Sequence, residues 1–398
     1  MTKSKISRFT SVALMLWFTV AAVTMGACSE DEKSGWADQK AFETAMAQYE
    51  AGLYTQSRDG FDTFMTTYPD SAYVSEATYY RALSYYHLEE YSQAAMLLEE
   101  ISSQIPAGAF AGAAWYYQGR CAYKLNGFDT AIEIFSAYLQ TGQDSSLADD
   151  ARYFLGRSYY ENDALSEALT VFDQIIALGV SPYLDSALFW AGRTEYDMGT
   201  VDLANVDAPH ITSAQGYFNR VLQEFAGGGY DDNASFFLAM TWFRLGEYQT
   251  AIDAFSTFTS TFPLSVYADN ADFYAAYAHY IMGEHSIAAA AMANFVEMYP
   301  DSGYTDNAIY MEGRAYYRVA NGESSGTATF EDAIARFEQI IVEYPTSNYV
   351  DNAYYYEIRA YIKNGDCNSA RDVMTQFESQ VMQSDYLQPA KDTLTSNC

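Results

Sequence analysis

The chain has 398 residues, of which 49% are hydrophobic and 17% aromatic, and its 21 Lys and Arg residues against 52 Asp and Glu residues give a formal net charge of −31. A surface this acidic repels phosphate backbones, which excludes nucleic acid as a partner. The apolar and aromatic content excludes a chain that is disordered throughout.

The N-terminus has the composition of a secretory signal. Three basic residues among the first eight precede an apolar stretch, Val12–Val23. The stretch is too short for a bilayer-spanning helix of about 20 residues but typical of a cleaved signal peptide. It ends in MGAC (25–28), which resembles the lipobox of bacterial lipoproteins. The resemblance implies that residues 1–27 are removed and that Cys28 is lipidated; ordinary cleavage beside an incidental cysteine is the alternative.

Residues 28–37 are polar and lack apolar periodicity, which predicts a short tether between the lipid and the folded part. Ser29, and not Asp, follows the cysteine. By resemblance to enterobacterial lipoproteins, this favours sorting to the outer membrane. The predicted location is therefore the outer membrane, with the chain lipid-anchored and facing the periplasm.

A repeat with a fixed period occupies residues 38–383. Each repeat has a small residue followed four positions later by a large apolar one. The small residues are Ser57, Ala94, Ala131, Ala168, Ala214, Ala251, Ala288, Ala333 and Ala370. The large residues are Phe61, Leu98, Phe135, Phe172, Phe218, Phe255, Met292, Phe337 and Met374. Six of the intervals between repeats are 37 residues and two are longer, 46 and 45. The pattern therefore predicts a solenoid of nine repeats with two insertions.

Each repeat contains two stretches of helical period separated by a short turn. Glycines in the first stretch, at Gly119, Gly156, Gly192 and Gly313, predict close helix packing. The insertions, near Thr200–Thr212 and Ala320–Thr329, are polar and predict exposed loops within repeats five and eight. Residues 384–398 predict a closing helix over the last apolar face. The predicted fold class is an all-α, right-handed α-solenoid of about nine helix-turn-helix repeats.

The repeat resembles the tetratricopeptide repeat. The family pattern of a small residue, an aromatic residue, Gly-x-Tyr, Ala, Phe and Pro is matched by Ala239, Phe243, Gly246, Tyr248, Ala251, Phe255 and Pro263. The family period is 34, and the additional residues here lie in segments such as YPDSGYTDNA (299–308). The Pro-x-Ser-x-Tyr run is similar to the longer repeats of the outer-membrane lipoprotein BamD and the periplasmic protein CpoB (YbgF). The chain has about twice the repeats of BamD-type chains and lacks the coiled-coil heptads of CpoB-type chains, so it resembles a longer member of that envelope group.

An aspartate recurs at the start of the first helix in six repeats, at Asp149, Asp185, Asp232, Asp269, Asp306 and Asp351. A carboxylate there is expected to cap the helix, because it accepts free backbone N–H groups and suits the positive end of the helix dipole. Calcium binding is the alternative, but no Asp-x-Asp-x-Asp-Gly loop is present.

Five arginines share one register, eight residues after this aspartate position. Helical spacing places each between an aromatic residue four positions earlier and another residue three positions later. In the tetratricopeptide family this face of the first helix lines the groove that grips peptides. By that resemblance, the predicted partner-binding groove consists of Tyr116, Arg120, Tyr123, Tyr153, Arg157, Tyr160, Phe189, Arg193, Tyr196, Tyr310, Arg314, Tyr317, Tyr355 and Arg359, with Lys124, Arg244, Arg318 and Lys363 at its edge. It would select anions through arginine forks and bind side chains through tyrosine rings. The alternative is structural: each arginine stacks on its own tyrosine and pairs with an acidic residue of the neighbouring repeat.

Three cysteines remain besides Cys28. Cys367 and Cys398 are candidates for a disulfide that fastens the closing helix, since the periplasm is oxidising. Cys121 is expected to pack as a small buried apolar residue.

The chain offers little catalytic chemistry. Its histidines are His87, His210, His279 and His285, and the spacing of the last two does not place them on one helix face as a zinc pair. Gly-x-Ser-x-Gly, phosphate-loop and CxxC motifs are absent. We therefore predict no enzyme activity, no cofactor and no metal.

The sequence leaves three functions open. The first is a lipid-anchored periplasmic scaffold that binds envelope proteins or their peptide segments, by resemblance most of all in outer-membrane protein assembly (BamD-like). The second is a coordinator of cell division associated with Tol-Pal and peptidoglycan (CpoB-like). The third is a surface lipoprotein whose tyrosine-rich faces bind glycans.

Overall fold

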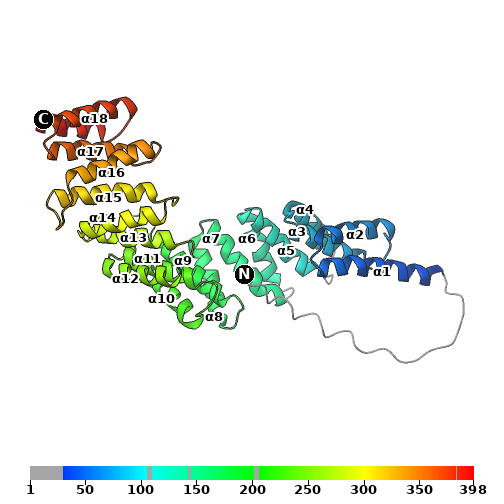
Figure 1. Cartoon of the computed structure of the whole chain (residues 1–398). Helices are drawn as coiled ribbons and strands as arrows, with labels where there is room; N and C mark the ends of the chain where they lie inside the picture. Colours follow the sequence, from blue (N-terminus) through cyan, green and yellow to red (C-terminus); the bar gives the residue numbers. More distant parts are fainter. Residues whose placement is uncertain (1–29, 105–109, 142–144, 201–205, 382) are drawn as a thin grey trace. The chain divides into compact units, whose positions relative to one another are not determined.

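A computed structural model describes residues 30–104, 110–141, 145–200, 206–381 and 383–398. Cys28 and the predicted signal peptide lie outside these residues. The chain divides into two compact units, one up to Ala114 and one from Trp115. Every regular element among the described residues is a helix, and antiparallel helix pairs follow one another along each unit (Figure 1). The predicted α-solenoid is therefore confirmed.

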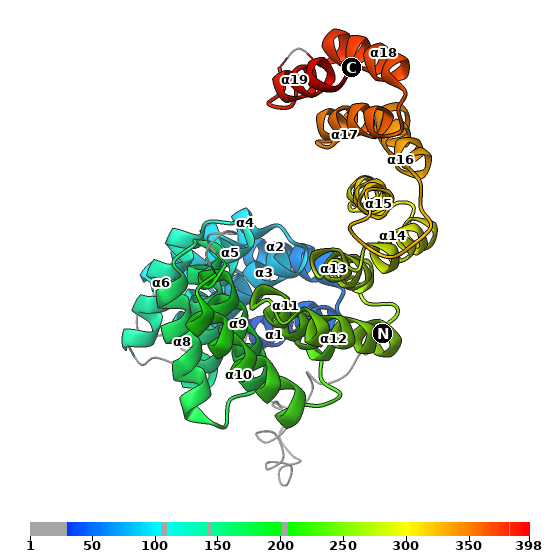
Figure 2. The ribbon, with the colours of Figure 1, turned by 90° about the vertical axis from the view of Figure 1, so that its left-hand side faces the viewer.

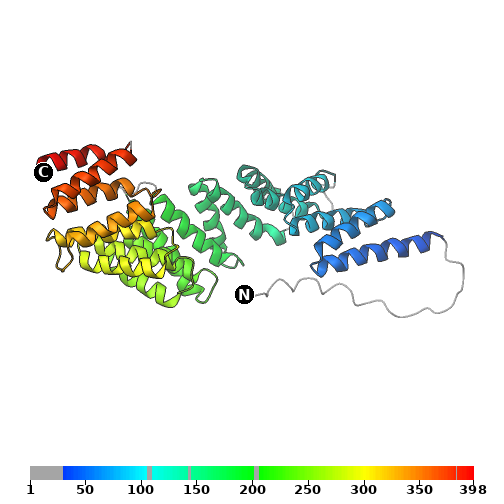
Figure 3. The same cartoon turned by 45° about the horizontal axis from the view of Figure 1, so that its top comes forward.

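The first compact unit contains repeats one and two and the start of helix α5. Its helices are α1 (Glu30–Glu50), α2 (Tyr54–Thr67), α3 (Val74–His87) and α4 (Tyr91–Gln104), followed by α5 (Ala111–Lys124), within which the division falls. Figure 3 shows α1 and α2 as one antiparallel hairpin, coloured blue. Helix α1 begins at Glu30, so most of the segment predicted as a tether is helical.

The second compact unit contains the other helix pairs. They are α5 and α6 (Phe128–Thr141), α7 (Ala148–Glu161) and α8 (Leu165–Leu178), α9 (Leu184–Met198) and α10 (Ala208–Glu224), α11 (Asp231–Arg244) and α12 (Tyr248–Thr261), α13 (Ala268–Ile281) and α14 (His285–Met298), α15 (Thr305–Ala320) and α16 (Phe330–Glu343), and α17 (Val350–Lys363) and α18 (Cys367–Gln380). A one-turn 3-10 helix, η1 (Ser145–Leu147), precedes α7, and α19 (Leu387–Asn397) follows α18. Figure 2 shows α15 to α19 in succession.

The insertions lie between the helices of repeats five and eight. Helix α10 begins at Ala208, so the first predicted loop is too long at its C-terminal end, and residues 201–205 lie outside the described part. The second loop runs from Asn321 to the next helix, which begins with a capping box between Thr329 and Asp332.

The small-and-large pattern forms the core within each repeat. The large aromatic residue of the second helix packs on the glycine of the first, so a Cβ added at Gly156 would lie 2.7 Å from Phe172, and one at Gly313 would lie 2.8 Å from Phe337. Both phenylalanines are fully buried. The glycines are therefore needed for close approach, as predicted.

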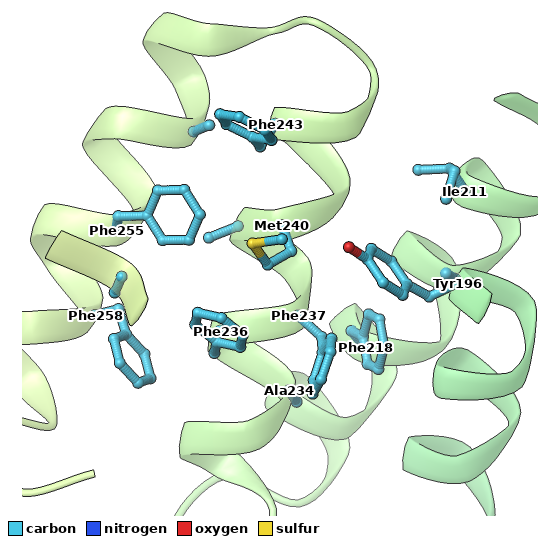
Figure 4. Close-up of a cluster of buried hydrophobic side chains, with 14 of the residues drawn as sticks. Tyr196, Ile211, Phe218, Ala234, Phe236, Phe237, Met240, Phe243, Phe255 and Phe258 are labelled. Atoms are coloured by element: carbon cyan, nitrogen blue, oxygen red, sulfur yellow. The ribbon is translucent and has the colours of Figure 1, made fainter. Parts of the chain in front are cut away.

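Adjacent repeats share one continuous core. In Figure 4, Phe218 of α10 lies beside Phe237 of α11, and Phe255 and Phe258 of α12 lie beyond Phe236. The rings of Phe218 and Phe237 stack with centroids 6.0 Å apart. Because each aromatic layer contacts the next repeat, no helix pair buries its apolar face alone.

The recurring aspartates hold the repeats together in a way the sequence did not predict. They lie in the second helical position and not at the N-cap, which is a tyrosine without a side-chain cap in α9, α11, α13, α15 and α17. In α13, α15 and α17 this tyrosine is the last residue of the Pro-x-Ser-x-Tyr run. In α15, Asp306 accepts the N–H of Asn307 (2.8 Å) and the hydroxyl hydrogen of Ser347 in the following repeat (2.6 Å). Four further aspartates accept a serine hydroxyl in the same way, from Ser71 to Asp38, Ser265 to Asp232, Ser302 to Asp269 and Ser384 to Asp351.

The tyrosine of the same run completes the contact between repeats. Tyr349 donates its backbone N–H to Ser347 (3.1 Å) and stacks on Tyr310 of the preceding repeat, with ring centroids 4.9 Å apart. The additional residues of the 37-residue period therefore form a polar and aromatic clasp between repeats.

Candidate functional site

The arginine register runs along the first helices of the second compact unit. Arg120, Arg157 and Arg193 lie on α5, α7 and α9, and Arg314 and Arg359 lie on α15 and α17. All five side chains are half-buried. In α11 and α13 the same position holds Met240 and Tyr277, so the register is interrupted in repeats six and seven. We call these five residues the arginine row.

Each of the first four guanidinium groups stacks on a ring of the following repeat. The Cζ atom of Arg120 lies 3.8 Å from the ring centroid of Phe154, and that of Arg157 lies 3.7 Å from Trp190. The corresponding distances are 4.3 Å from Arg193 to Phe237 and 4.1 Å from Arg314 to Tyr356. Such cation–π contacts contribute about 0.5–2 kcal/mol each, so the arginines help to join the repeats.

The tyrosine four residues earlier is a hydrogen-bond partner and not the closest stacking surface. Arg120 donates to the hydroxyl of Tyr116 (2.6 Å), and Arg314 donates to that of Tyr310 (3.0 Å). We considered from the sequence that each arginine stacks on the tyrosine of its own helix. The arginines do pack on aromatic rings, but the nearest ring belongs to the next repeat. The sequence signal is an aromatic residue three positions before the register, as at Phe154 and Tyr356.

The acidic partners also differ from that alternative. Arg157 pairs with Glu161 (2.7 Å) and Arg193 pairs with Asp197 (2.9 Å), each four residues later on the same helix and not in a neighbouring repeat. The two arginines are thereby neutralised locally. Arg314 and Arg359 form no ion pair with any described residue.

The residue four positions after the arginine explains this difference. It is acidic in α7 and α9, but it is Arg318 in α15 and Lys363 in α17. Like charges at this spacing repel each other on a helix surface. Arg318 is compensated by Glu323 of the second insertion, while Lys363 is exposed and forms no ion pair with the described residues.

Burial removes six aromatic residues from the predicted groove. Tyr116, Tyr153, Phe189, Tyr196, Tyr310 and Tyr317 have at most 8% of their surface exposed. They fill the space between helices, because the position four residues before the arginine faces the second helix of its own repeat. Tyr123, Tyr160 and Tyr355 are half-buried and stay in the candidate surface with the arginine row.

Two tyrosine hydroxyl groups near the arginine row, those of the retained Tyr160 and the buried Tyr196, form hydrogen bonds with charged side chains. The hydroxyl of Tyr160 donates to Asp197 (2.5 Å), and burial, with that bond, raises the pKa of Tyr160. Arg244, at the edge of the row, donates to the hydroxyl of Tyr196 (3.1 Å) and forms no ion pair within the described residues.

The structure contains the candidate disulfide and the buried cysteine that the sequence indicated. Cys367 and Cys398 are joined by a disulfide with Cα atoms 5.6 Å apart, which links α18 to the end of α19. Cys121 is a buried free thiol, and burial raises its pKa to about 12, so it is an inert packing residue.

The described residues also bear on metal binding and on membrane spans. The described residues contain no cluster of three or more His, Cys, Asp and Glu side chains suited to a metal ion. Among the described helices, none combines the length and apolar character needed to cross a bilayer.

Within the described residues, successive helix pairs with small and large apolar residues packed inside them define a tetratricopeptide-repeat solenoid, a class of protein-interaction scaffold. A family model described as an outer-membrane lipoprotein (YfiO) matches residues 235–356, and two tetratricopeptide-repeat models match residues 103–146 and 41–71. These matches support a tetratricopeptide-repeat family of outer-membrane lipoproteins.

Two solved structures are similar to the chain at low sequence identity, and the first supports the fold. The C-terminal part of a tetratricopeptide repeat-containing protein from Cytophaga hutchinsonii is 17% identical, with 67% of this chain and 98% of that chain covered and a TM-score of 0.54. A tetratricopeptide repeat protein from Parabacteroides merdae is 15% identical, with 72% and 98% covered and a TM-score of 0.47. No curated protein matches the chain.

Proposed function

We propose that this chain is a lipid-anchored scaffold of the bacterial envelope, which binds protein partners from the periplasmic side of the outer membrane. The observation that carries the proposal is the match of residues 235–356 to the outer-membrane lipoprotein model. The matched segment contains α12 to α16 in full, together with most of α11 and the first half of α17, and it includes Arg314. Together with Cys28 behind a signal-like N-terminus, it supports an anchored repeat protein.

The partner surface is the arginine row with the half-buried tyrosines around it. These arginines belong to the first helices of repeats three to five and of repeats eight and nine. An extended polypeptide that crosses either group of helices would meet one arginine of the row in each repeat of that group, but none in repeats six and seven, where Met240 and Tyr277 hold the position. Proteins of this repeat class bind peptides or protein partners, and their activity is typically not catalytic. Within this class, outer-membrane protein assembly (BamD-like) is the assignment we favour.

The test is capture of partners from the envelope in which the full chain is made. The tagged chain is cross-linked in living cells, solubilised in detergent and purified, and the co-purifying proteins are identified by mass spectrometry. A β-barrel insertase supports the proposal. Tol-Pal proteins or peptidoglycan synthases would instead support the CpoB-like role, and a glycan without protein would overturn the scaffold.

A second measurement tests the anchor. Metabolic labelling with palmitate should label the wild-type chain and not the Cys28→Ala variant, and the variant should leave the membrane fraction. Equal labelling of both chains would contradict lipidation at this residue.

A further inference from the structure

The C-terminal end of the arginine row holds two cations around one ring. The Cζ atom of Arg314 lies 4.1 Å from the ring centroid of Tyr356, and that of Arg359 lies 5.4 Å from the same centroid. Helices α15 and α17, which carry these arginines, contact each other directly. Two guanidinium groups therefore flank Tyr356 without an ion pair to any described carboxylate.

This arrangement is unfavourable for the chain alone. Arg359 and Lys363 lie one helical turn apart, and like charges at this spacing repel each other on a helix surface. A shortage of acidic residues is not the reason, since the chain has 52 of them against 21 basic ones. Arg157 and Arg193 show that a carboxylate four residues later is compatible with the same helix.

The Nε atom of Arg314 is buried without a hydrogen-bond partner, as is the Nε atom of Arg157, and the ring centroid of Tyr280 lies 5.9 Å from the Arg314 guanidinium. Buried donors of this kind are normally satisfied. The one buried carboxyl group close in sequence to Arg359 offers little negative charge at neutral pH, because burial, and then Glu338, raise the pKa of Glu357 to about 8.

We propose that Arg314, Arg359 and Lys363 form a carboxylate-binding subsite that takes an acidic segment of a protein partner. The guanidinium groups supply fork-like donors for Asp or Glu side chains, and the half-buried Tyr355 and Tyr356 supply apolar contact between them. A peptide with a few carboxylates fits a chain of this net charge better than a membrane surface or phosphate polymer does, since those are repelled over a longer range. The inference rests on the proposed scaffold function and names its ligand.

The experiment measures binding of a defined peptide to the full chain by fluorescence anisotropy. The probe is a fluorescein-labelled, C-terminally amidated peptide with the core Glu-Phe-Glu-Phe-Glu, and its control has Gln in place of each Glu. The test variant carries Arg314→Gln and Arg359→Gln. The matched control variant carries Arg152→Gln and Arg220→Gln, which removes the same charge from two arginines outside the arginine row that are paired with Asp149 and Glu224.

The wild-type chain should bind the Glu peptide and bind the Gln peptide at least about tenfold more weakly. The test variant should lose about tenfold or more in affinity for the Glu peptide, while the matched control loses less than about twofold. Equal binding of the two peptides, or equal losses in the two variants, would overturn the subsite. Preference for an oligomer of uronic acid over the Glu peptide would overturn the assignment to a protein segment.

Two measurements keep the result interpretable. Circular dichroism checks that each variant is folded. If the test variant is not folded, the variant Lys363→Gln, at an exposed residue, should still weaken Glu-peptide binding by about threefold. Unchanged binding in that variant would overturn the subsite. Capture of an envelope protein without Glu-peptide binding would overturn the proposed subsite but still support the scaffold function. Glu-peptide binding without capture of any envelope protein would support the subsite and overturn the proposed scaffold function.

Discussion

Helices α7 and α9 can be compared with α15 and α17, because they carry the same arginine in the same register. In both pairs the guanidinium lies on an aromatic ring. Helices α7, α9 and α15 pack through a glycine on the second helix of their repeat, whereas α17 has Ile358 at that position. The charges differ: α7 and α9 provide a carboxylate one turn after the arginine, while α15 and α17 provide a second cation. The repeat therefore sets the position of the arginine, and the next turn sets whether its charge is available.

A second contrast lies beneath the row, six residues after the aspartate position. This position holds Leu155 in α7 and Ala191 in α9, but Glu312 in α15 and Glu357 in α17, which are 2% and 3% exposed. Glu312 faces Arg336 of α16 at 3.3 Å. Buried carboxyl groups are costly in a solenoid core, so the C-terminal repeats combine uncompensated cations with stability that depends on pH.

The largest expected effect tests whether the two regions share one kind of core. Phe172→Ala and Phe337→Ala each remove a fully buried ring that packs on a glycine, and each should destabilise its own repeat by about 3–5 kcal/mol. Native-state hydrogen exchange of α7 and α8 in the first variant, and of α15 and α16 in the second, measures this locally. Losses that differ by more than about twofold would show that the cores are not equivalent.

A smaller effect separates the regions by pH. The pKa of Glu357 is raised to about 8 by burial and by Glu338, against an ordinary value of 4.5, so the folded state favours the protonated group. This stability is fully present below about pH 4.5 and is lost as the pH rises through 8. Between pH 5 and pH 8 the loss should be on the order of 3 kcal/mol for the repeat that contains α17.

The Glu357→Gln variant isolates that effect. It keeps the shape of the side chain and cannot ionise, so hydrogen exchange in α17 should become nearly independent of pH, while exchange in α7 should behave as in the wild type. An unchanged pH dependence in the variant would assign the effect to another buried carboxyl group, such as Glu312 of α15, whose pKa is also raised by burial.

The period, the helix pairs and the glycine contacts were predictable, because each follows from a spacing that recurs along the chain. The clasp between Asp306 and Ser347 was not, since it joins residues 41 positions apart that no local pattern pairs. The buried tyrosines were placed in the groove because helical spacing gives a direction and not the distance to the neighbouring helix. The charge at the fourth residue after the arginine was readable in the sequence, and it separates Arg157 and Arg193, which are followed by a carboxylate, from Arg314 and Arg359, which are followed by a cation.

The smallest expected effect comes from exchanging the charge that follows the arginine by four residues between α17 and α7. Lys363→Glu places a carboxylate one turn after Arg359, as Glu161 stands after Arg157, and should stabilise α17 by about 0.5 kcal/mol. It should also weaken binding of the Glu peptide by about threefold or more, because Arg359 becomes paired within the chain. Glu161→Lys should do the reverse in α7, with a stability loss of similar size and tighter Glu-peptide binding. Thermal unfolding measures stability, and anisotropy titrations at low and physiological salt measure peptide binding. If an unpaired arginine is kept for a ligand at a cost in stability, the two quantities should change in opposite directions. A change in the same direction in either variant would contradict this idea.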